Sequence, residues 1–151
     1  MTKPMSEAAR RQALAYIASC TDAAKLRQMA KNAGAAGEAE VQRAARKRLY
    51  EVAPSEEPGT LEHEVWQSIF ALEDALSDES GTTKRLSRTR QKITRDGEHK
   101  TVSDLVLGKP SPGFTMLIDR DMRERTFEAV ALRFPGRFSA EVLSAAKQRL
   151  E

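Results

Sequence analysis

Apolar residues recur every three or four positions across residues 60–80, which is the spacing of one face of an α-helix. This stripe consists of Leu61, Val65, Ile69, Leu72 and Leu76, and it is widened by Trp66 and Phe70. Thr60 stands just before it and can cap the first turn. A stripe of this width needs a partner surface, so we predict a long amphipathic helix at the centre of the fold.

Weaker helical stripes predict further helices on both sides of the central one. The expected ranges are 6–20, 21–33, 38–50, 84–95, 102–107, 112–118, 125–133 and 139–150. Ser6, Thr21 and Ser111 are the expected N-caps of three of them, and Thr101 with Asp104 resembles a capping pattern. No stretch alternates convincingly between apolar and polar residues as a half-buried strand does, so we predict an all-α bundle of about eight helices.

A bend at Pro58-Gly59 is the best boundary along the chain. It predicts an N-terminal helical hairpin region at 1–51. A second region at 60–151 holds the central helix, a basic segment and the C-terminal helices, and it can be one compact domain. A shift of 101 residues aligns the apolar positions of 26–49 with those of 127–150, which predicts similar helical hairpins near both ends. Ala-rich amphipathic helices also match through their period alone, so a true duplication remains one of two interpretations.

Charge is distributed in blocks, although the net charge is only +3. Residues 1–51 hold ten basic and five acidic residues, whereas residues 52–83 hold eight acidic residues and no Lys or Arg. The sign then reverses: residues 84–95 carry six basic residues and no acid. Such an asymmetry indicates an interaction with a charged partner more clearly than the total does.

The basic segment is the main candidate site. Its cations are Lys84, Arg85, Arg88, Arg90, Lys92 and Arg95. On a helix, the steps from Arg85 to Arg88, Lys92 and Arg95 place these four side chains on one face, where they can contact phosphates. This pattern favours a non-catalytic nucleic-acid-binding accessory or regulatory protein. The run contains no aromatic residue, which argues against stacking on the bases of a single strand.

Two other interpretations of the basic segment stay open. Its cations can pair with the acidic helix that precedes it, giving a solvated charged surface of little energetic weight. They can also dock an acidic protein, which would make the chain an interaction adaptor or an immunity-type factor.

Arg43, Arg46 and Lys47 could extend the basic surface. They lie in the second helix of a hairpin that partly resembles a DNA-reading helix-turn-helix. The first buried position of that helix, Val41, comes late for the usual short turn, so a plain packing hairpin is the preferred interpretation.

Catalytic and metal-binding signals are weak. His63 and His99 have no second ligand at a suitable spacing, and we expect His63 to be an exposed polar residue. Cys20 fits a buried thiol better than a nucleophile. We therefore expect no cofactor, no metal and no catalytic residue. With a single cysteine and no apolar run long enough to span a bilayer, the sequence predicts a cytoplasmic protein without a membrane partner.

Overall fold

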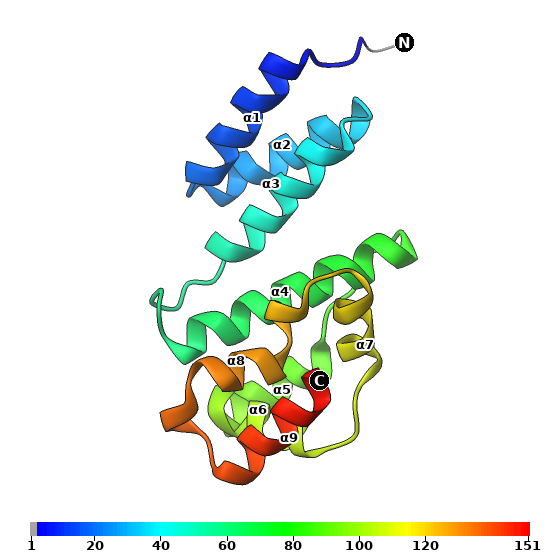
Figure 1. The fold of residues 1–151 in the computed structure, drawn as a ribbon. Coiled ribbons are helices and arrows are strands. Elements are labelled where there is room, and N and C mark those ends of the chain that lie inside the picture. The colour runs from blue at the N-terminus through cyan, green and yellow to red at the C-terminus, as the bar shows by residue number, and fades with distance from the viewer. Residues whose placement is uncertain (1–2) are drawn as a thin grey trace. The chain divides into compact units, whose positions relative to one another are not determined.

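A computed structural model describes residues 3–151 (Figure 1). Within this range all regular secondary structure is helical, with nine α-helices and two short 3-10 helices, Arg123–Arg125 and Pro135–Arg137. The α-helices are α1 (Glu7–Ser19), α2 (Ala23–Ala35), α3 (Ala39–Val52), α4 (Leu61–Ser80), α5 (Ser87–Asp96), α6 (Glu98–Leu107), α7 (Pro112–Asp119), α8 (Phe127–Arg133) and α9 (Ala140–Leu150). The predicted all-α class is confirmed.

Side-chain caps fix several helix starts where the sequence placed them. Ser6, Thr60 and Ser111 each accept a hydrogen bond from a backbone N–H of the first turn of α1, α4 and α7. Each such cap typically contributes about 1 kcal/mol because it satisfies a donor that has no partner inside the helix. Gly81 ends α4 with a positive φ of 75°, a conformation that costs glycine little.

Two expected caps are wrong. Asp22, not Thr21, caps α2, because its carboxylate accepts the N–H groups of Ala24 and Lys25. Thr101 lies inside α6, where its hydroxyl donates to the carbonyl of Gly97 at 2.7 Å. The sixth helix therefore begins at Glu98, four residues before the expected start at 102.

The chain divides into two compact units, Met1–Ser55 and Glu56–Glu151. In the first, α3 packs against both α1 and α2. Its core is made of Ile17, Cys20, Leu26, Ala30, Ala33, Val41 and Ala45. The backbone N–H of Met5 and the guanidinium of Arg10 both donate to the Glu38 carboxylate, at 2.8 and 3.2 Å, so the residues before α1 are held against the turn before α3.

The second unit is built around α4, the predicted central helix. It packs against α6, α7 and α8, while α9 packs against α6 and α8. The core residues are Leu61, Val65, Ile69, Ile93, Val102, Val106, Val130, Ala131, Phe138, Val142 and Ala146. Burial of each large aliphatic side chain contributes about 1.5–3 kcal/mol, so this core carries much of the stability of the unit. The α2–α3 and α8–α9 hairpins lie near the two ends of the chain, as predicted (Figure 1).

Gly113 permits a close contact between α7 and α4. A Cβ atom at this position would lie 2.6 Å from Leu72 Cδ2, so the Leu72 side chain would have to move to make room for it. The missing side chain lets α7 approach the half-buried end of the α4 stripe at Leu72 and Leu76. The space left around these two leucines is part of the pocket described below.

Candidate functional site: the basic segment and the pocket beside it

A carboxylate of α4 anchors the start of the basic segment. Glu73 accepts the backbone N–H of Leu86 at 2.8 Å, and its two oxygens accept Arg90 Nε and Nη2 at 2.7 and 2.6 Å. The Arg90 guanidinium also lies over the rings of Trp66 and Phe70, 5.3 and 5.6 Å from their centroids. The hydrogen bonds to Glu73 raise the pKa of Arg90 above its ordinary value. Arg90 is therefore engaged within the protein.

A second contact to α4 fixes the residues that precede α5. The backbone N–H of Lys84 donates to Ser77 Oγ at 2.8 Å, and that hydroxyl also lies 3.4 Å from the carbonyl oxygen of Lys84. Together with the Glu73 bond at Leu86, this holds the backbone of residues 84–86 along the C-terminal half of α4. The helix begins at Ser87, so Lys84 and Arg85 lie before it. The expected helix range of 84–95, which placed Arg85 on the same helix face as Arg88, is therefore wrong at its start.

Lys92 is also engaged. Its ammonium donates to Asp96 at 3.0 Å and to Asp104 of α6 at 2.8 Å, and the bond to Asp104 is the main reason that the pKa of Lys92 is raised. The pKa of Asp104 is lowered chiefly by Lys92, and that of Asp96 chiefly by its hydrogen bonds with Arg95. Arg95 is paired with its neighbour but still largely exposed, with 68% of its side chain accessible. We call Arg90, Lys92 and Arg95 the anchored half of the basic segment.

The remaining cations form the free half: Lys84, Arg85 and Arg88. Their side chains are exposed and make no hydrogen bond or ion pair with any residue that the structure describes. They surround the N-terminus of α5, whose N-cap residue, Leu86, has no oxygen in its side chain to cap the helix. The N–H groups of Ser87, Arg88 and Thr89 accordingly keep their hydrogen-bonding capacity, and a helix N-terminus with open donors favours anions.

The other predicted cations lie on α3. Arg43 and Lys47 are exposed and stand four residues apart, so they share a face of that helix. Arg46 is half-buried and already interacts with another part of the protein, so it is not free to bind a ligand. Within the first unit, Arg43 and Lys47 are therefore the members of this trio best placed to meet a ligand.

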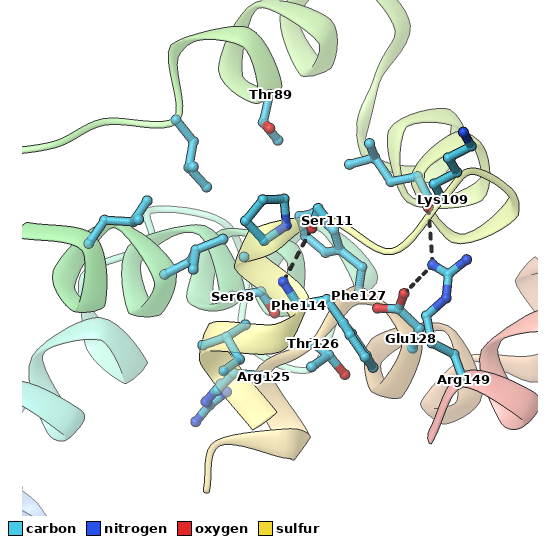
Figure 2. A pocket seen from close by; sticks show the side chains of 17 residues that line it. Ser68, Thr89, Lys109, Ser111, Phe114, Arg125, Thr126, Phe127, Glu128 and Arg149 are labelled. Atoms are coloured by element: carbon cyan, nitrogen blue, oxygen red, sulfur yellow. Dashed lines mark hydrogen bonds and ion pairs between the residues drawn. The ribbon is translucent and has the colours of Figure 1, made fainter. Parts of the chain in front are cut away.

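A pocket of about 330 Å³ lies in the second unit (Figure 2). Leu86 and Thr89 form one side of it, next in sequence to Arg85 and Arg88. Its walls are mostly apolar and come from α4, α6, α7, α8 and the loop before α7. The main apolar contributors are Leu72, Leu76, Leu105, Pro112, Phe114 and Phe127. The sequence analysis did not predict this pocket, because its lining residues come from segments that are far apart in the chain.

An ion pair closes one end of the pocket. Arg149 Nη1 donates to Glu128 Oε2 at 2.7 Å, and the same guanidinium reaches the carbonyl oxygens of Leu105 and Gly108 at the end of α6. Figure 2 shows this pair beside Lys109 and Phe127. Only 5% of Glu128 is accessible, although it lines the pocket. The second carboxylate oxygen, Oε1, has no hydrogen-bond partner among residues 3–151.

The two histidines differ from each other. His63 is buried, with 7% of its surface accessible, so the expectation that it is exposed is wrong. Residues of α4 outside its apolar stripe are also buried, and His63 is one of them. His99 is exposed, contacts the carbonyl oxygen of Arg137 through Nε2 and stacks on Phe138.

Searches of the described residues and comparisons with known proteins add little to this picture. In residues 3–151, no three His, Cys, Asp or Glu side chains are grouped so that they could hold a metal ion. The same residues include no helix with the length and apolarity needed to cross a membrane. No family model, no curated protein and no solved structure matches the chain.

Proposed function

We propose that the protein is a non-catalytic nucleic-acid-binding accessory factor that contacts phosphates through the free half of the basic segment. The observation that carries this proposal is the combination of three exposed cations with three open backbone donors at the N-terminus of α5. Guanidinium, ammonium and first-turn N–H groups are the donors that proteins use on phosphate oxygens. None of these groups has to break an internal bond before it binds.

The anchored half supports the phosphate contact without making it. Glu73 binds both Leu86 and Arg90, so the backbone that carries Arg85 and Arg88 has a fixed position before any ligand arrives. A fixed segment loses less conformational entropy on binding than a flexible loop would. Arg43 and Lys47 of α3 form a separate pair of exposed cations in the first unit, which we propose binds phosphate on its own.

The test compares two double variants that remove the same charge. In Arg85→Ala/Arg88→Ala the free half loses two cations. The matched control, Arg123→Ala/Lys147→Ala, loses two exposed cations elsewhere in the second unit, and neither has a partner among the described residues. At low salt, we expect the first variant to bind duplex and single-stranded DNA at least about tenfold more weakly, and the control to bind almost as well as wild type. An equal loss of affinity in both variants would contradict the proposal, because it would show that binding depends only on the total charge.

A second candidate is docking of an acidic protein, which would make the chain an interaction adaptor. It is favoured by the exposure of Leu105 and Leu107 near the pocket, because exposed leucines beside unpaired cations fit an acidic, amphipathic partner. If wild type binds neither duplex nor single strand at low salt, this candidate takes precedence. A pull-down from the source cells with wild type and the Arg85→Ala/Arg88→Ala variant would then identify the partner.

A further inference from the structure

The pocket and the free half share one stretch of backbone. Leu86 and Thr89 line the pocket, while Arg85 and Arg88 precede them directly and point their charges at solvent. The open N–H of Thr89 belongs to the same residue that forms the pocket wall. A ligand seated in the pocket thus has cations and anion-binding donors at its edge.

The size and the walls of the pocket fit a flat aromatic ring. Its volume of about 330 Å³ lies at the lower end of the range for small-molecule sites, about 300–1,000 Å³. Phe114 of α7 and Phe127 of α8 contribute aromatic surface from two helices, and Leu105 and Pro112 add aliphatic surface (Figure 2). A base ring buries both faces against such groups, as it does in proteins that bind single strands.

Glu128 is one of several polar groups that line the pocket, and it is the acceptor on which the choice of base edge depends here. Glu128 is almost fully buried, and its Oε1 is not used by Arg149 or by any other described residue. A carboxylate oxygen in apolar surroundings accepts hydrogen bonds and repels other acids. It therefore favours a ligand with an N–H donor and disfavours one that ends in a carboxylate or a carbonyl.

From these contacts we infer that the pocket takes one unpaired nucleobase with an exocyclic amine, while the free half and the first turn of α5 hold the adjacent phosphate. This inference rests on the proposed function and specifies its ligand as single-stranded nucleic acid. A base inside a duplex reaches such a pocket only after it leaves the stack, which costs free energy, and an unpaired base avoids this cost. Cytosine offers an amine donor where thymine has a carbonyl acceptor, so cytosine is the better pyrimidine for Glu128.

The experiment measures binding of short fluorescent oligo(dC), oligo(dT) and duplex probes to the full chain. We use Leu105→Trp, which adds bulk at the half-exposed mouth of the pocket, and Leu107→Trp as the matched control. Leu107 is on the same helix, is exposed to a similar degree and does not line the pocket. Thermal melting of both variants reports whether each is folded.

We expect wild type to bind oligo(dC) more tightly than oligo(dT), and both more tightly than duplex. Leu105→Trp should weaken oligo(dC) binding at least about fivefold, the loss expected when a stacked base is excluded. It should leave duplex binding and its salt dependence unchanged, and Leu107→Trp should change neither. Glu128→Gln, if folded, should reduce the difference in affinity between oligo(dC) and oligo(dT), because an amide N–H can donate to a thymine carbonyl.

The outcomes separate this inference from the proposed function. Binding that depends on Arg85 and Arg88 but shows no strand or base preference, and no difference between the two tryptophan variants, overturns the nucleobase pocket and leaves phosphate binding standing. Absence of binding to all three probes at low salt overturns both.

Discussion

The two halves of the basic segment carry the same kind of charge but have different surroundings. Arg90 and Lys92 each face two acceptor groups supplied by acids, Glu73 for Arg90 and Asp96 with Asp104 for Lys92. Lys84, Arg85 and Arg88 face solvent and an uncapped helix end. A cation whose charge is already neutralised holds helices together, whereas an unpaired one is available to a ligand. The density of basic residues therefore overstates the surface that can bind phosphate.

The difference between the halves arises from the helices that each one meets. In the anchored half, Arg90 pairs with Glu73 of α4 and Lys92 with Asp104 of α6, whereas Arg95 pairs only with Asp96 of α5 itself. In the free half, Lys84 and Arg85 lie before α5 and Arg88 lies in its first turn. None of the three pairs with an acid of α4 or α6. Stability should depend most on the anchoring carboxylate of Glu73, less on the ionisation of Asp96 and Asp104, and least on the free cations.

Removal of the Glu73 carboxylate should have the largest effect. Glu73→Ala leaves the Arg90 guanidinium and the Leu86 N–H without their acceptor in a largely buried place. Because Arg90 keeps some solvent access, we expect a loss of about 2–4 kcal/mol in the free energy of unfolding, somewhat below the value for a fully buried pair. Urea denaturation measures it. Glu79→Ala, on the exposed end of the same helix, is the control and should cost less than about 0.5 kcal/mol.

Acid should weaken the anchored half. The pKa values of Asp96 and Asp104 are lowered in the folded chain from an ordinary value of 3.8. The stability that they contribute is therefore present above that value and is lost as the pH falls below it through the folded pKa values. In thermal melts across this range, wild type should lose more stability than Asp96→Asn/Asp104→Asn. Parallel pH profiles in the two proteins would show that these pairs do not stabilise the fold.

Substitution in the free half should leave stability almost unchanged. Arg85→Ala/Arg88→Ala removes no contact within the described residues, so the free energy of unfolding should stay within about 0.5 kcal/mol of wild type. Urea denaturation again provides the measurement. A larger loss would mean that these two cations help to hold the fold, and the distinction between the halves would fail.

Periodicity and capping chemistry predicted most of the fold. The α4 stripe, the caps at Ser6, Thr60 and Ser111, and the hairpins near both ends all follow from local patterns that tertiary structure did not override. Two wrong predictions concern N-cap residues. Asp22 offers a stronger acceptor than Thr21, and the hydroxyl of Thr101 bonds back to the preceding turn instead of starting a helix.

The site was harder to predict because its residues meet only in the folded chain. The pairing of Lys92 with Asp104 joins residues on two helices, and that of Arg90 with Glu73 spans a turn whose course the sequence does not define. The pocket gathers residues of α4, α5, α6, α7, α8 and α9. Phe114 and Phe127 lie on different helices, and no local pattern indicates that both line one pocket.

The central claim is that the free half, and not the anchored half, binds phosphate, and the salt dependence of duplex binding tests it most directly. Three contacts predict a slope of log affinity against log salt of about −2.7 from this segment, at about −0.9 per phosphate. Arg85→Ala/Arg88→Ala should therefore make the measured slope less steep by about 1.8. Arg123→Ala/Lys147→Ala should leave it as in wild type. Equal slopes in wild type and the Arg85→Ala/Arg88→Ala variant would contradict the account.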